Sequence, residues 1–161
     1  MKSIHQFTVK DLKQQDVSLE KYKGKVLLIV NTASKCGLTP QYKDLEDLYA
    51  AFKGKDFEIL AFPSNDFGSQ EPLNGAEIQE FCDINFKTTF PLFDKVVVTG
   101  DHACPLFHFL SDKSLNGKVN VAPKWNFQKY LINKEGEVVD YYLPITSPTT
   151  SKIKKAISKL L

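Results

Sequence analysis

The chain has 161 residues, of which 42% are hydrophobic and 25% are charged, and its formal net charge is +2. These values are typical of one soluble globular domain spanning residues 1–161, and they exclude disordered, collagen-like and low-complexity classes. All 21 basic residues are lysine. Because planar recognition of phosphates and bases usually falls to arginine, no nucleic-acid partner is expected.

No apolar run approaches the roughly 20 residues that a bilayer span needs, so stable membrane insertion is not expected. The opening ten residues carry no apolar core behind Lys2, unlike a secretory signal. Three cysteines are too few, and too odd in number, for a disulfide scaffold: Cys36, Cys82 and Cys104. We therefore expect a cytoplasmic protein in which any disulfide is transient and catalytic.

The first half of the chain predicts a strand, a helix and a second strand. Residues 26–30 form a short apolar run rich in β-branched residues, which is typical of a strand buried on both faces. Apolar residues then recur at helical spacing from Pro40, and Gly54 ends the pattern. A second buried strand is predicted at residues 57–62. This order is a βαβ unit with parallel strands.

The second half predicts the remaining elements in chain order: a helix at 75–85, a short edge element at 96–98, a short helix at 105–110, a hairpin of 125–132 with 138–143, and a final helix from about 149. Asn74 and Glu77 have the spacing of a capping box at the first of these helices. The whole order predicts an α/β, thioredoxin-like mixed sheet flanked by helices, with an N-terminal β extension.

Cys36 has the setting of a reactive thiol. It follows the first buried strand and precedes the helix that begins at Pro40, and sites tend to form at such strand ends. The helix amino terminus and Lys35 both favour a thiolate, so we expect a lowered pKa and a nucleophilic sulfur. Thr39 stands where a CxxC pair would have its second cysteine, which argues against an ordinary disulfide oxidoreductase.

Three segments, NTASKCGLTPQY (31–42), FPSNDFGSQEP (62–72) and WNF (125–127), resemble the three motifs of the glutathione peroxidase family. The resemblance implies an enzyme that reduces hydroperoxides without a bound cofactor or metal. It also implies that the peroxide-reducing centre consists of Cys36, Gln70, Trp125 and Asn126. Neutral donors of this kind stabilise a thiolate without quenching its nucleophilicity.

The resemblance further implies a resolving cysteine. Cys82 matches the position at which many sulfur-containing members carry it, so we expect a Cys36–Cys82 disulfide intermediate, formed after local unwinding of residues 78–90. Such two-cysteine members generally resemble thioredoxin-dependent peroxidases, which makes thioredoxin the expected reductant and glutathione the alternative. The short stretch 115–124 leaves little room for an assembly loop. We therefore expect a monomer with an open site for hydrogen peroxide and lipid hydroperoxides.

Two positions depart from many relatives, which have a cysteine where Ser64 stands and a glutamine where Asp66 stands. Cys104 matches no family role, and its grouping with His102 and His108 lacks a fourth metal ligand. Two other classes of function remain open: a peroxide sensor that relays its oxidation to a partner protein, and a non-catalytic binding module.

Overall fold

The computed structural model describes residues 2–161 and is built around a mixed four-stranded sheet. The strand order is β4-β3-β5-β6. The strands are β3 (Val26–Thr32), β4 (Phe57–Pro63), β5 (Lys129–Ile132) and β6 (Val138–Tyr142). β3 pairs in parallel with β4 and antiparallel with β5, and β5 pairs antiparallel with β6. The predicted βαβ unit and hairpin are both confirmed.

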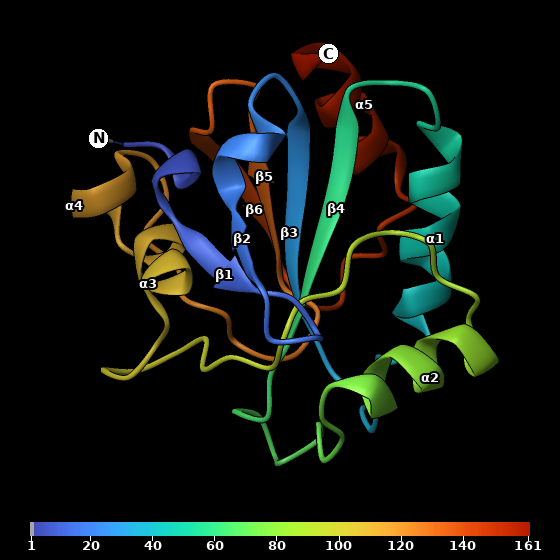
Figure 1. The fold of residues 1–161 in the computed structure, drawn as a ribbon. Coiled ribbons are helices and arrows are strands. Elements are labelled where there is room, and N and C mark those ends of the chain that lie inside the picture. Colours follow the sequence, from blue (N-terminus) through green and yellow to red (C-terminus); the bar gives the residue numbers. More distant parts are fainter. Residues whose placement is uncertain (1) are drawn as a thin grey trace.

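The continuous apolar run of β3 exists because both faces of the sheet are covered (Figure 1). Leu28 and Val30 point into a core cluster shared with helices α1 (Gln41–Ala51) and α5 (Ser151–Leu160). Leu27 and Ile29, one residue out of phase, point into a second cluster with helix α3 (Pro105–Ser111). A strand buried on both faces cannot alternate polar with apolar residues, which is why the sequence shows an unbroken run.

Shorter elements complete the layers on either side of the sheet. They are the 3-10 helices η1 (Ile4–Gln6) and η2 (Leu19–Tyr22), the two-stranded sheet of β1 (Thr8–Lys10) and β2 (Asp16–Ser18), and the helices α2 (Ala76–Asn85) and α4 (Lys113–Asn116). The small β1–β2 sheet is the predicted N-terminal β extension. Within residues 2–161, no helix combines the length and apolarity that crossing a bilayer requires.

Three local predictions were wrong. The N-cap of α2 is Gly75 rather than Asn74, although Glu77 still accepts a hydrogen bond from the Asn74 backbone N–H. Residues 96–98 form no strand, because they meet the sheet through single bonds such as Val96 N–H to the carbonyl of Pro63. Residues 125–128 lie outside β5, since Phe127 adopts a positive φ of 68° that no extended strand allows.

One buried cation fastens β5 to the loop that follows β6. The Lys129 side chain is 0% exposed, and its ammonium donates to the backbone carbonyls of Leu143 (3.5 Å), Pro144 (2.9 Å) and Thr146 (2.6 Å). Burial lowers the pKa of Lys129 to about 7. The three carbonyls oppose that effect, since they can all be satisfied only by the three N–H groups of the charged form.

Replacing Lys129 with methionine should therefore destabilise the fold. Lys129→Met keeps the length of the side chain but leaves three carbonyls without their donor, and we expect a loss of about 2–4 kcal/mol in the free energy of unfolding. Urea denaturation measures the loss. Lys43→Met, at an exposed lysine paired only with Asp47, is the control and should change stability by less than about 0.5 kcal/mol. Equal effects of the two substitutions would contradict this role of Lys129.

Candidate active site

The Cys36 loop, residues 33–40, joins β3 to α1 and is shaped by Thr39. The Thr39 hydroxyl donates to the carbonyl of Ala33 (2.8 Å) and accepts from the backbone N–H of Cys36 (2.9 Å). The Cys36 sulfur accepts one hydrogen bond, from the backbone N–H of Leu38 (3.3 Å). The thiol is half-buried, so this turn presents a sulfur with a backbone donor to the surface. Such a donor stabilises negative charge on the sulfur.

The Gln70 loop, residues 64–72, follows β4 and lies beside the Cys36 loop. The backbone N–H of Lys35 donates to the carbonyl of Gln70 (2.9 Å), which joins the two loops next to Cys36. The side-chain amide of Asn126 donates to Oε1 of Gln70 (3.0 Å). This bond occupies the carbonyl end of the Gln70 amide. The N–H groups of the Gln70 amide therefore remain available to donate to a thiolate or a substrate.

Trp125 packs beside the same amide. Its indole ring is 37% exposed and lies 5.5 Å, centroid to centroid, from the ring of Phe67. A Cβ placed on Gly68 would lie 3.4 Å from Cη2 of Trp125 and 3.5 Å from Nε2 of Gln70. Both distances are ordinary van der Waals contacts, so the indole and the amide line the space beside position 68, and a side chain larger than alanine there would press on both groups. The structure brings Gln70, Trp125 and Asn126 together and places the Cys36 loop next to them.

Asn31, which the sequence reasoning missed, anchors the Trp125 segment to the end of β3. Its side-chain amide donates to the carbonyl of Trp125 (3.0 Å), and its backbone carbonyl accepts from the backbone N–H of Phe127 (2.6 Å). Asn31 is 0% exposed. The signal available in the sequence was a polar residue that continues an apolar strand, because a buried polar side chain requires a partner. Gly68, too, was visible inside its motif but had no assigned role.

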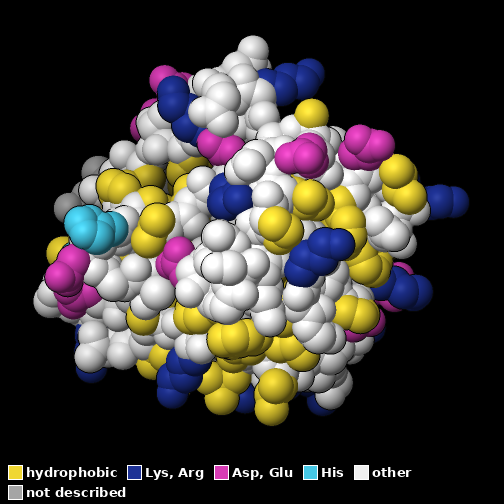
Figure 2. Space-filling model, turned by 90° about the horizontal axis from the view of Figure 1, so that it is seen from below, with side chains coloured by type: hydrophobic (Ala, Val, Ile, Leu, Met, Phe, Trp, Pro, Cys, Tyr) yellow, Lys and Arg dark blue, Asp and Glu magenta, His cyan; other side chains and the backbone are white. Residues whose placement is uncertain are grey.

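Figure 2 views the end of the molecule at which β3 and β4 finish, and apolar side chains gather over much of that face. Trp125 belongs to the large hydrophobic residues that remain exposed, as do Leu143 (42%) and Ile145 (80%) in the loop after β6. An exposed apolar surface of this kind suits a bulky or apolar substrate, or a protein partner.

Cys82 occupies a different environment. It lies on α2, is 0% exposed, and packs in the core cluster that includes Tyr42. Burial raises the pKa of the Cys82 thiol to about 12, although the hydroxyls of Tyr42 and Thr88 beside it favour the thiolate. All three cysteines are free thiols in this structure. Cys82 is therefore protonated and shielded while α2 is docked.

Cys104, at the start of α3, lies close to Asp66 of the Gln70 loop. Burial is the main cause that raises the pKa of Cys104, and the Asp66 carboxylate adds to it. Asp66 accepts hydrogen bonds from the backbone N–H groups of Val98 (2.8 Å) and Thr99 (3.1 Å). Asp66 thus fastens the segment before α3. In the described part of the chain, no three His, Cys, Asp or Glu residues are grouped as a metal site would require.

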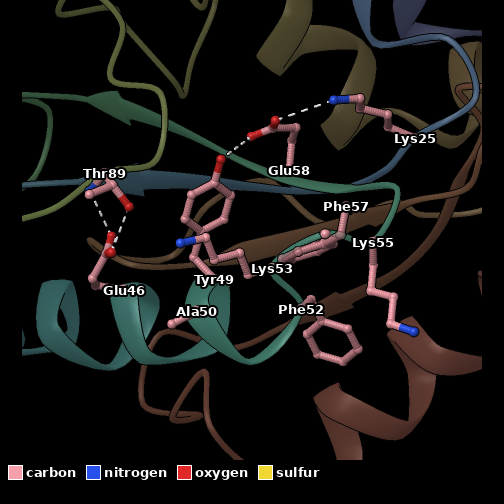
Figure 3. Close-up of a pocket in the computed structure, with 11 residues that line it drawn as sticks. Lys25, Glu46, Tyr49, Ala50, Phe52, Lys53, Lys55, Phe57, Glu58 and Thr89 are labelled. Carbon is pink, nitrogen blue, oxygen red and sulfur yellow. Dashed lines mark hydrogen bonds and ion pairs between the residues drawn. The ribbon is translucent and has the colours of Figure 1, made fainter.

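A pocket of about 560 Å³ lies away from these loops, between the end of α1 and the start of β4 (Figure 3). Its acidic side chains are already engaged. Glu58 accepts from the Tyr49 hydroxyl (2.8 Å) and pairs with Lys25, and Glu46 accepts from Thr89. No cysteine lines this pocket.

Comparison with known proteins decides the family. The glutathione peroxidase family model matches residues 4–111. The chain belongs to the glutathione peroxidase family. The predicted peroxidase activity and thioredoxin-like fold are thereby confirmed. A probable phospholipid hydroperoxide glutathione peroxidase from Citrus sinensis is 54% identical over 99% of this chain and 94% of its own length.

Solved structures agree with this assignment. The crystal structure of Trgpx in apo form is similar at a TM-score of 0.78 and 41% identity, over 98% of this chain and 94% of that one. The crystal structure of T. cruzi GPX1 is similar at a TM-score of 0.77 and 34% identity, over 99% and 96% of the two chains. A thioredoxin-family protein from Chlorobium tepidum shares the fold at a TM-score of 0.67 and 12% identity, covering 96% of this chain and 92% of that one.

The expected cytoplasmic location of this glutathione peroxidase is contradicted by its relatives. A probable glutathione peroxidase of Arabidopsis thaliana, 54% identical over 99% of this chain, is named as mitochondrial, and another, 52% identical over 99%, as chloroplastic. The matched region spans only 76% and 68% of those two relatives. The names of these relatives thus point to organelles rather than to the cytoplasm.

The space beside Gly68 yields a direct test of this centre. Gly68→Val should lower the second-order rate constant for oxidation by hydrogen peroxide at least about tenfold. The added methyl groups displace Trp125 and Gln70, and misplaced catalytic groups cost rate steeply. Gly54→Val is the matched control, since Gly54 also has a positive φ (81°) but has nothing near its Cβ position. The control should keep its peroxide rate, and equal losses in both variants would contradict the assignment.

Proposed function

We propose that this chain reduces hydrogen peroxide and organic or lipid hydroperoxides at Cys36, and that thioredoxin recycles it through a Cys36–Cys82 disulfide. The observation that carries the proposal is the bond between the amides of Asn126 and Gln70, beside the Trp125 indole. The loop that carries this amide is joined to the Cys36 loop by the bond from the Lys35 backbone N–H to the Gln70 carbonyl.

In the first step, the Cys36 thiolate attacks the terminal oxygen of the hydroperoxide. A sulfur–oxygen bond forms, the oxygen–oxygen bond breaks, and the leaving oxygen takes a proton to become water or an alcohol. Cys36 is oxidised by two electrons to a sulfenic acid. The Leu38 backbone N–H, the Gln70 amide and the Trp125 indole N–H are the neutral donors that stabilise charge on the sulfur and on the leaving oxygen.

In the second step, the Cys82 sulfur attacks the Cys36 sulfenic acid. The sulfur–sulfur bond forms, the sulfur–oxygen bond breaks, and water leaves. We propose that α2 first unwinds over residues 78–90. Two features support a low local stability there: Lys87 has a positive φ of 51°, and Ile84 is 69% exposed.

In the third step, the dithiol of thioredoxin reduces the disulfide and is itself oxidised to a disulfide. The exposed Trp125 side chain favours a protein reductant over the small, highly charged glutathione. The chain also has no arginine with which to clamp the glutathione carboxylates. The exposed indole and the names of the phospholipid hydroperoxide relatives support bulky peroxides as substrates.

Steady-state NADPH consumption with thioredoxin and thioredoxin reductase tests this cycle. The wild type should turn over hydrogen peroxide and a lipid hydroperoxide, whereas Cys36→Ser and Cys82→Ser should each lose at least about 99% of that activity, because each removes one half of the disulfide. Cys104→Ser is the control and should retain it. Turnover that persists in Cys82→Ser, or that only glutathione supports, would contradict the resolving step. Rapid oxidation of Cys36 without turnover by either reductant would favour a sensor.

The pH dependence of disulfide formation separates an unwound from a docked α2. While docked, Cys82 has a pKa raised to about 12, so its thiolate fraction would climb about tenfold per pH unit through pH 10. Once unwound, the thiol returns to a pKa of roughly 8.5, and the rate should level off near pH 9. We expect levelling, measured by acid quench and thiol labelling at saturating peroxide. A rate that keeps rising through pH 10 would contradict unwinding.

A further inference from the structure

The residue after Gln70 carries a carboxyl group in an unusual place. Glu71 is 0% exposed, its Oε2 accepts a hydrogen bond from the hydroxyl of Ser34, and its buried Oε1 has no hydrogen-bond partner. Burial raises the pKa of Glu71, while hydrogen bonds from Ser34 and Leu73 and the charge of Lys95 act against that shift. A buried carboxyl with one unpaired oxygen costs free energy wherever it stands. The burial of Glu71 therefore does not favour the stability of the fold, and a functional role of this residue would explain it.

The backbone of Glu71 is held from two further segments. Its N–H donates to the side-chain oxygen of Asn65 (3.0 Å), and its carbonyl accepts from the ammonium of Lys95 (2.8 Å). Asn65 follows β4, and Lys95 belongs to the extended segment that precedes α3. Glu71 is thus fixed within its own loop and against a neighbouring segment. Its side chain is left to bond to the Cys36 loop.

Two hydrogen bonds in succession join the Gln70 loop to the Cys36 loop. The Ser34 hydroxyl donates to the carboxyl of Glu71, and the Lys35 backbone N–H donates to the carbonyl of Gln70 (2.9 Å). Cys36 directly follows Lys35 in the chain. The two bonds therefore lie between Cys36 and the fixed backbone of Glu71, and they hold the two loops against each other.

We propose that Glu71 is a positioning residue for peroxide reduction: its bond to Ser34 holds the Cys36 loop in register with the Gln70 loop, so that the Gln70 amide faces the Cys36 sulfur. The inference rests on the proposed function, because it assumes that Gln70 assists the reaction at Cys36. Glu71 itself touches neither sulfur nor substrate. Its carboxyl serves as a hydrogen-bond acceptor, not as a charge or a proton donor.

The rate constants of Cys36 with hydrogen peroxide and with iodoacetamide, measured side by side, test this role. Glu71→Ala and Ser34→Ala should each lower the peroxide rate constant at least about tenfold, since small misplacements of catalytic groups cost that much. They should change the iodoacetamide rate constant, measured on the fully ionised thiol at high pH, by less than about threefold, because alkylation has no leaving oxygen for the amide to stabilise. Equal losses with both reagents would overturn the proposal.

Glu71→Gln is the conservative rescue. The amide oxygen of glutamine still accepts the Ser34 hydroxyl, so the peroxide rate constant should stay within about threefold of the wild type. A loss as large as that of Glu71→Ala would assign the effect to the charge and overturn a positional role. Near-ultraviolet circular dichroism checks the fold. If Glu71→Ala does not fold, Ser34→Ala, which removes a single oxygen, carries the comparison.

A double-mutant cycle with Gln70→Ala separates this inference from the proposed function. Because Glu71 acts through Gln70, adding Glu71→Ala or Ser34→Ala to Gln70→Ala should lower the peroxide rate constant less than about threefold further. Losses that multiply in full would overturn the positioning role while leaving the active-site assignment intact. A Gln70→Ala variant that keeps the wild-type rate would instead overturn the assignment of Gln70, and with it the proposed centre.

Discussion

The arrangement of the candidate active site depends on how the antiparallel pairing of β3 with β5 ends. The regular ladder runs from Leu27 opposite Ile132 to Val30 opposite Lys129. One residue further, the Asn31 carbonyl still accepts from Phe127, but the positive φ of Phe127 turns the preceding residues out of the sheet. Trp125 and Asn126 are thereby directed towards the loops that follow β3 and β4. A longer regular ladder would leave both side chains in the pleat of a strand, out of reach of Gln70.

The two cysteines of the proposed cycle have opposite surroundings, and this contrast separates their tasks. Cys36 stands in a half-buried turn that already supplies a backbone donor. Cys82 stands in a packed helix face where burial keeps it protonated. A resolving thiol that reacted in the docked state would close the disulfide without any movement. In the proposed cycle, a shielded resolving thiol would couple each turnover to an opening of α2. The same opening would expose the disulfide to a large reductant.

The sequence predicted β3, α1 and β4 within a few residues. Burial on one or both faces determines the spacing of apolar residues in such elements, and that spacing can be read from the sequence. Prediction from the sequence failed where a single backbone conformation or a single contact determines the local structure. The backbone of Phe127 departs from β geometry although its neighbours look like a strand. Residues 96–98 are apolar and β-branched, yet no ladder forms. The burial of Glu71 was equally invisible, since glutamate is seldom buried. Only the approach of two loops far apart in sequence encloses it.

Buried polar groups at this end of the sheet tie the two halves of the site to common points. The carbonyl of Pro144 accepts from the Gln41 side chain (2.8 Å) and from Lys129 (2.9 Å). Gln41 begins the helix that follows Cys36, and Lys129 begins the strand that follows Asn126. The Pro144 carbonyl oxygen thus holds both of these segments, while the Ser34–Glu71 and Lys35–Gln70 bonds hold the Cys36 loop against the Gln70 loop. Apolar packing alone leaves such loops free to slide, whereas directional hydrogen bonds in a dry interior do not. The free-energy cost of burying these polar groups is therefore coupled to a fixed arrangement of the two loops. In the proposed mechanism, that arrangement holds the donors in place before a peroxide binds, as preorganised stabilisation of a thiolate requires.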